Sequence, residues 1–236
     1  MNRLSIYTIV LTMLFNVQNS QAQETGMLDD KQKSIVLISS FASKGDVANL
    51  EIQLNKGLDA GLTINEIKEM LVHLYAYAGF PRSLNALNLF KKVVDERIAK
   101  GITDTEGKSF GLPKQHARKY EQGRKTLEEI SGAKQPKPAL GYGEFAPRVD
   151  AFLKEHLFAD LFESDVLNYA QRELVTISIL ATIPGLQAQL RSHIGVGMNT
   201  GLKEAELKEA FHLIGGYDAA QGEIALTELN TVVNKK

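Results

Sequence analysis

The feature that most constrains this chain is an internal duplication: residues 32–94 align with residues 172–234 at a constant offset of 140, without a gap. The clearest anchor is GLTINEIKE at 61–69 against GLKEAELKE at 201–209. Glycines and apolar residues also stay in phase, with Gly45, Leu50, Gly57, Gly61, Tyr77 and Val93 falling on Gly185, Leu190, Gly197, Gly201, Tyr217 and Val233. Self-similarity at one fixed offset indicates two copies of one structural unit. The fold must therefore be one that a small unit can adopt twice.

Each copy is predicted to contain three helices. In the second copy, ELVTISILATI carries apolar residues at helical spacing and stops at Pro184-Gly185, which continues a helix poorly. The next segment places Leu186, Leu190, Ile194 and Met198 one helical turn apart. In the first copy, Thr63 and Glu66 match a capping box, which predicts the start of the third helix. No segment alternates apolar and polar residues convincingly as a strand does, so the predicted fold class is all-α, as two tandem helical units.

The predicted organisation has four parts. These are a signal peptide at 1–22, a first unit at 27–98, a linker at 99–115 and a second unit at 116–236. The linker is polar and contains glycines, and it is followed by HARKYEQGRKTLEEISG, which is predicted to be helical. A second break, AKQPKPALGYGEFAP, is rich in proline and precedes another predicted amphipathic helix or helix pair. The second unit is therefore expected to be longer than the first at its amino end.

The amino terminus predicts export. Arg3 is followed by an apolar run from Leu4 to Val17 and then by Ser20-Gln21-Ala22, the pattern of a secretory signal peptide cut after Ala22. The run is about 14 residues long, shorter than the roughly 20 needed to span a bilayer, and no other run of that length follows. We therefore expect a periplasmic or secreted protein without a membrane span in its mature form. The chain has no cysteine, so it has no disulfide to form there.

Charge and composition narrow the classes of partner. The formal net charge is -1 for the whole chain, and the sequence contains no basic stripe and no aromatic platform. A nucleic-acid partner is therefore not expected. With 44% hydrophobic residues, the chain can bury a sizeable core. The five histidines include no pair at the i, i+4 spacing of a helical zinc site, so no metal site is predicted.

Four segments carry a resemblance to a known family. These are YAYAGFPRSLNAL (75–87), HLFADLFESDVL (156–167), RELVTISIL (172–180) and QLRSHIGVGMNTGLKEAEL (189–207). They resemble the carboxymuconolactone decarboxylase family, which also contains the alkylhydroperoxidase D type proteins, and the likeness covers most of the mature chain as two tandem units. The resemblance implies small helical units that assemble into rings, with sites between units. For a tandem chain it implies a homo-oligomer, a trimer with a pseudo-hexameric arrangement.

The peroxidase branch of that family uses two cysteines and a histidine, because one thiolate attacks the peroxide and a second thiol resolves the product. Aligned on His193, the two cysteine positions hold Leu186 and Gln189. In the first copy the three corresponding residues are Asp46, Asn49 and Gln53. Thiol peroxidase chemistry is therefore excluded for this chain, and a peroxiredoxin assignment would be inherited from relatives.

The decarboxylase branch works without cysteine and implies three candidate catalytic residues. His193 matches the family's histidine on the second helix of the unit, and an imidazole titrates near neutral pH, so it can act as acid or base. Glu173 matches the proton shuttle of the peroxidase branch. Asp160, in the Ala159-Asp160 pair, stands where the family's decarboxylases carry Gly-Glu. A shortened carboxylate at this position departs from the family pattern.

Four further residues are candidates for substrate binding. Gln189 lies one turn before His193 and replaces a residue that is commonly glutamate in the family. Arg191 and Arg172 can supply positive charge for a carboxylate substrate. His73 matches a family histidine in the first copy, whereas the second copy has Leu213 at that place.

Each of these residues also has a structural interpretation. A lone histidine on a helix is often a hydrogen-bonded core residue, a glutamate in the first turn of a helix is favoured by the helix dipole, and the two arginines can hold inter-unit ion pairs. His73 and His156 lie beside large apolar residues, which favours packing.

Two functions stay open at this level. The first is a cofactor-independent lyase, or a related hydrolase or isomerase, that acts on a small carboxylate or lactone through His193. The second is a non-catalytic ligand-binding or assembly protein that retains the family fold. The absence of thiols and the predicted export favour the second, since a lactone decarboxylase of aromatic breakdown normally meets its substrate in the cytoplasm.

Overall fold

The computed structural model describes residues 27–113 and 117–234, and within these ranges every regular element is a helix. The all-α prediction is therefore confirmed. The predicted signal peptide, residues 1–22, lies outside the described residues. Within the described ranges, no helix combines the length and the apolar character that crossing a bilayer requires.

The first copy begins with a well-capped helix. Its helices are α2 (Asp30–Lys44), α3 (Val47–Asp59), α4 (Ile64–His73), α5 (Tyr75–Ala78) and α6 (Phe80–Ala99). Asp29 accepts a hydrogen bond from the Gln32 amide, and Gly45 ends α2 in the left-handed region with φ of 71°. The predicted capping box is confirmed, because the Thr63 oxygen accepts from the Glu66 amide and the Glu66 carboxylate accepts from the Thr63 amide.

The second copy repeats this pattern. Its helices are α10 (Tyr169–Thr182), α11 (Gln187–Asn199), α12 (Glu204–Gly215) and α13 (Ala219–Val233). The prediction of three helices per copy is wrong, because the chain turns after α4 and after α12 and adds α6 and α13. Both additions follow short turns that the sequence pattern does not separate from the preceding helix. In the first copy that turn contains Gly79, with φ of 82°.

The first helices of the two copies correspond at an offset of 139 rather than 140. The capping box of Asp29 and Gln32 matches that of Asn168 and Gln171. An added Cβ at Gly57 or at Gly197 would lie 2.8 Å from an isoleucine Cδ1, that of Ile38 or Ile177. The gap-free alignment is therefore wrong over this helix, and the extra residue lies in the loop before α11. As a result Glu173 corresponds to Ser34, and Arg172 to Lys33.

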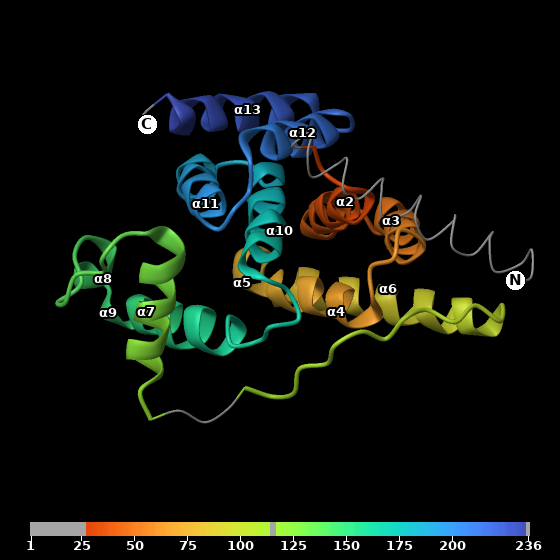
Figure 1. Ribbon diagram of the computed structural model, residues 1–236, viewed down its shortest axis with the longest axis horizontal. Helices are drawn as coiled ribbons and strands as arrows, with labels where there is room; N and C mark the ends of the chain where they lie inside the picture. The colour runs from red at the N-terminus through yellow and green to blue at the C-terminus, as the bar shows by residue number, and fades with distance from the viewer. Residues whose placement is uncertain (1–26, 114–116, 235–236) are drawn as a thin grey trace, which may run out of the picture.

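The segment between the copies forms a helical arm. It consists of α7 (Lys119–Ser131), α8 (Tyr142–Phe145), α9 (Pro147–Ala151) and a π-helix, η1 (Phe152–Leu161). Figure 1 shows this arm at one end of the molecule, with α7 beside η1. The two helices approach closely at Gly123, where an added Cβ would lie 1.7 Å from the Lys154 carbonyl oxygen. The predicted helix after the linker is confirmed by α7.

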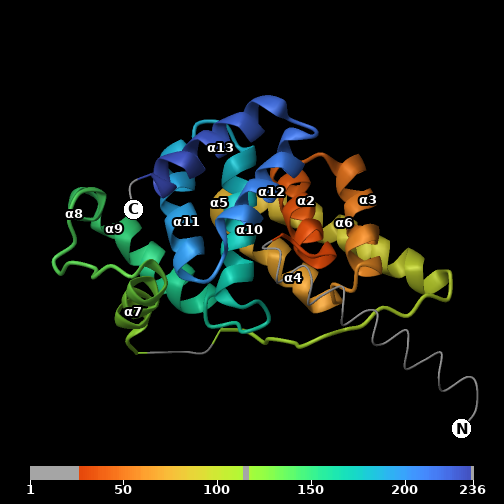
Figure 2. The same cartoon turned by 45° about the horizontal axis from the view of Figure 1, so that its top comes forward.

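One apolar core joins the two copies. The first helices, α2 and α10, pack against each other, and buried residues of both belong to the same cluster. From Arg172 to Thr182 every residue of α10 is buried, including the polar residues Arg172, Glu173, Thr176 and Ser178. Figures 1 and 2 both show α10 in the middle of the molecule, between the helices of the first copy and α11 to α13. Polar groups on α10 are therefore held inside the protein.

Candidate functional site

The centre of the candidate site is a carboxylate–imidazole pair on two helices of the second copy. Nδ1 of His193, on α11, lies 2.8 Å from Oε2 of Glu173, on α10. The Glu173 side chain is fully buried, whereas 17% of the His193 side chain is exposed. A carboxylate at Nδ1 orients the ring and leaves Nε2 as the nitrogen that can exchange a proton. Within the described ranges no hydrogen bond to that Nε2 is present.

The first copy completes the surroundings of this pair. The ring of Tyr77, on α5, meets the His193 ring edge-on, with centroids 5.5 Å apart. His73, at the end of α4, places Nε2 2.9 Å from Oγ1 of Thr176 on α10. The candidate site is therefore built by both copies: α10 and α11 carry the titrating pair, and α4 and α5 cover it.

Burial sets the protonation states around the pair. Burial lowers the pKa of His73 well below its usual value, and the nearby charges of Arg172 and His193 lower it further. Burial raises the pKa of the Tyr77 phenol, and the negative charge of Glu173 adds to this shift. His73 is therefore neutral and Tyr77 protonated at neutral pH. Both present uncharged polar groups beside His193.

Arg172 is fully buried and joins the copies. Its Nη2 donates to Oε1 of Glu69 at 2.5 Å and to the Ser164 carbonyl at 2.7 Å, and its guanidinium lies over the Phe162 ring. The equivalent contact on the other side is the pair between Lys33 and Glu209, at 3.3 Å. Glu209 is the counterpart of Glu69, so the two ion pairs are related by the duplication. Arg172 thus holds an inter-unit ion pair, the structural alternative considered for it.

Several buried polar atoms near this contact have no hydrogen-bond partner among the described residues. They are Oε1 of Glu173, Nδ1 of His73, Oγ of Ser164, and Nε and Nη1 of Arg172. Buried polar atoms in proteins are rarely left unpaired, and those that are mark functional sites or positions of bound water. The unpaired atoms come from α4, α10 and the segment before α10. They are concentrated around the contact between Arg172 and the first copy.

The structure places Asp160 in a different cluster. Its Oδ1 is 2.7 Å from Nζ of Lys119, and its Oδ2 is 3.2 Å from Nδ1 of His156. The other ring nitrogen of His156 bonds to the hydroxyl of Tyr75, whose ring stacks on Phe80. Asp160 thus serves the contact between the helical arm and the first copy. No described contact links it to His193.

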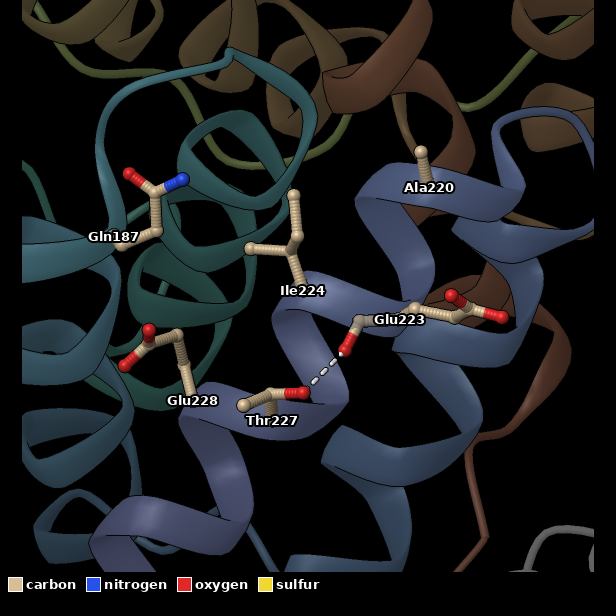
Figure 3. A pocket seen from close by; sticks show the side chains of 6 residues that line it. All are labelled: Gln187, Ala220, Glu223, Ile224, Thr227 and Glu228. Atoms are coloured by element: carbon tan, nitrogen blue, oxygen red, sulfur yellow. Dashed lines mark hydrogen bonds between the residues drawn. The ribbon is translucent and has the colours of Figure 1, made fainter.

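Gln189 and Arg191 lie on the exposed side of α11. The Arg191 guanidinium pairs with Glu228 of α13 at 2.6 Å, and Gln189 has no hydrogen bond with another described residue. Glu228 also lines an open hollow of about 480 Å³ between the start of α11 and α13, together with Gln187 and Glu223. Figure 3 shows these side chains around the hollow, with the Thr227 hydroxyl bonded to the Glu223 carbonyl. This hollow contains neither Glu173 nor His193.

Comparison with known proteins supplies the family. The sequence model of the carboxymuconolactone decarboxylase family matches residues 10–92 and 147–228, more than half of the chain. The chain belongs to this family. The two matched segments agree with the duplication and confirm the resemblance found in the sequence. An uncharacterized protein of Methanocaldococcus jannaschii is 31% identical over 70 residues, which are 30% of this chain and 65% of that relative, so slightly under two thirds of the relative is covered.

As a member of the carboxymuconolactone decarboxylase family, this chain has no cysteine. Leu186 and Gln189, which the resemblance aligns with the family's two cysteines, lie at the start of α11. Within the described residues no group of three or more histidine, aspartate or glutamate side chains is arranged to hold a metal ion.

Sequence reasoning about this family member missed two residues of the site, Tyr77 and Thr176. Tyr77 was visible only as one matched position of the duplication, since an aromatic residue near a glycine turn carries no chemical signal. Thr176 follows Glu173 by three residues on one helix, so both point to the same side. That spacing could have identified Thr176 from the sequence. The contacts that Tyr77 and Thr176 make with the other copy could not be predicted from spacing along the chain.

Proposed function

We propose that the protein is a cofactor-independent lyase, or a related hydrolase or isomerase, that acts on a small carboxylate or lactone with His193 as its acid or base. The observation that carries the proposal is the hydrogen bond of 2.8 Å between His193 and the buried carboxylate of Glu173. A carboxylate at Nδ1 fixes the orientation of the ring, so that Nε2 is the nitrogen available for proton transfer with a substrate. The His193 side chain is 17% exposed, and no described residue hydrogen-bonds to its Nε2.

In a decarboxylation of this kind the bond between the carboxyl carbon and its neighbour breaks and carbon dioxide leaves. The electron pair stays on the substrate, spreads onto the lactone carbonyl and is quenched when His193 delivers a proton to carbon. Tyr77, protonated at neutral pH, is the neighbouring hydroxyl donor for the developing oxyanion. The sequence suggested Gln189 and Arg191 for substrate binding and Asp160 for catalysis. We propose supporting roles for these three residues.

The test is a screen of the purified protein against lactones and small unsaturated acids, followed by release of carbon dioxide or by ring opening. His193→Asn keeps a polar side chain but removes the imidazole that would transfer the proton, so turnover should fall by about a hundredfold or more. His212→Asn is the matched control, because His212 is exposed on α12. Unchanged turnover in His193→Asn would refute the assignment. A screen without any turnover would favour the ligand-binding or assembly alternative.

Export and assembly are separate parts of the proposal. The apolar run at 4–17 and the small residues at 20–22 support cleavage after Ala22 and a periplasmic or secreted location. Family membership supports a homo-oligomer, a trimer with a pseudo-hexameric arrangement. Cell fractionation with sequencing of the mature amino terminus tests the first, and light scattering coupled to gel filtration tests the second.

A further inference from the structure

A second pocket, which we call the inter-copy pocket, lies where the carboxyl ends of α2 and α10 meet. Its volume is about 480 Å³. Ser43 and Lys44 of the first copy line it together with their counterparts Thr182 and Ile183 of the second. Because equivalent residues face it from both sides, the pocket straddles the approximate two-fold relation between the copies. It is thus a product of the duplication, absent from a single unit.

The charges in this pocket do not balance. Lys44 and Asp218 form an ion pair of 2.7 Å across it, which leaves the guanidinium of Arg82 as the remaining charge on its lining. No carboxylate among the described residues pairs with Arg82. The guanidinium lies against Gly45, whose added Cβ would fall 1.9 Å from Nη1. The counterpart of Arg82 in the second copy is Gly222, so this cation occurs on one side only.

The end of α2 offers Arg82 a purely structural role, since a cation is favourable beside helix carbonyls. That role requires no pocket and no apolar neighbours. The rest of the lining is largely apolar, with Tyr77, Ala78, Ile183 and Pro184 around the cation. A fork of guanidinium donors facing an apolar hollow is the usual arrangement for binding the carboxylate of a small organic acid.

Tyr77 connects the inter-copy pocket to the candidate site. It lines the pocket, and its ring also meets His193 edge-on at 5.5 Å between centroids. We propose that the inter-copy pocket binds a small monocarboxylate with an apolar body, held by Arg82, and that Tyr77 forms the wall between this pocket and the candidate site. The proposal goes beyond the proposed function and does not depend on it, because binding a carboxylate in this pocket requires no turnover.

The binding test uses benzoate as the probe and benzamide as its uncharged analogue, with titration calorimetry on the full protein. Benzoate should bind, and benzamide should bind at least tenfold more weakly. Arg82→Gln should weaken benzoate binding about tenfold or more, since a hydrogen-bonded charge is lost. Arg82→Lys keeps the charge but not the forked pair of donors. Its affinity for benzoate should therefore lie between those of the unaltered protein and of Arg82→Gln. Arg148→Gln removes an exposed arginine elsewhere and should leave binding unchanged.

The inference is overturned if benzoate fails to bind, if benzamide binds equally well, or if Arg82→Gln binds benzoate like the unaltered protein. His193→Asn separates this inference from the proposed function. Benzoate binding that survives in His193→Asn, while any turnover is lost, places the ligand in the inter-copy pocket and the chemistry at His193. Binding that is lost in His193→Asn but kept in Arg82→Gln would place the ligand at His193 and reject the pocket.

Discussion

The two copies share a scaffold but differ in the residues that can do chemistry. At equivalent places the second copy carries Glu173 and His193, and the first carries Ser34 and Gln53. The helix contact beside these positions is nevertheless the same, with glycine against isoleucine in both copies. A duplicated fold thus keeps its packing while only one copy keeps the titrating pair. The other copy contributes the cover over that pair, through His73 and Tyr77.

The largest expected effect concerns the two inter-copy ion pairs. Glu69→Gln should cost about 3–5 kcal/mol of unfolding free energy, because it leaves the fully buried Arg172 without its countercharge. Glu209→Gln, at the equivalent place, should cost about 1 kcal/mol or less, because 35% of the Lys33 side chain is exposed. Urea unfolding of the two variants measures the difference. Equal costs would show that the copies contribute alike to the contact.

The catalytic asymmetry is tested by Glu173→Gln. The amide keeps the shape of the side chain but removes the carboxylate that orients the His193 ring, so turnover should fall by about a hundredfold. Ser34→Ala is the matched change in the first copy and should leave turnover unaltered. Activity assays with circular dichroism as a folding check give both results. Full activity in Glu173→Gln would remove the carboxylate from the mechanism.

The last two helices of the second copy, α12 and α13, approach each other closely at Gly222. A Cβ added at Gly222 would lie 2.5 Å from the Cα of Gly215, and backbone cannot move aside easily. Gly222→Ala should therefore cost about 1–3 kcal/mol. Gly195→Ala, on α11, has open space and should be neutral or stabilising by up to about 1 kcal/mol. A loss of thermal stability in Gly195→Ala equal to that in Gly222→Ala would contradict the close approach.

The buried histidine of the first copy predicts a pH effect on stability. The folded state holds His73 neutral, with a pKa well below the value near 6.5 expected when unfolded, so the unfolded state binds more protons in acid. Stability should therefore fall as pH drops below about 6.5, by at most about 1.4 kcal/mol per pH unit from this group. His73→Leu reproduces Leu213 of the second copy and should reduce the slope. Urea unfolding at pH 7.5 and 5.5 checks it, and an unchanged slope would show that His73 is charged when folded.

The smallest expected effect is that of Arg191→Gln. Its ion pair with Glu228 is on the exposed side of α11, so unfolding free energy should change by about 0.5 kcal/mol and KM by less than twofold. Steady-state kinetics on any substrate found in the screen decides the matter. A tenfold rise in KM would instead put Arg191 at the substrate, as the sequence suggested.

Much of the fold follows from local chemistry that a reader of the sequence can see. Thr63 and Glu66 predicted a helix start because capping involves residues three apart, and the apolar spacing in ELVTISILATI predicted a helix that ends before Pro184. The one-residue shift between α2 and α10 could not be detected in the sequence. When two apolar helices share few identical residues, an alignment displaced by one position looks equally good. The capping boxes at Asp29 and Asn168 reveal it once both helix starts are known.

The sequence by itself determined the all-helical class, the duplication, the family and the absence of thiol chemistry, because these depend on residue types and on spacing along the chain. It also singled out Glu173 and His193 as candidates. Only the tertiary structure decided that these two side chains bond to each other, that Asp160 lies with Lys119 instead, and that Tyr77 covers the pair from the other copy. Those contacts join residues distant in sequence, and the packing of α10 between the copies, rather than any local pattern, brings them together.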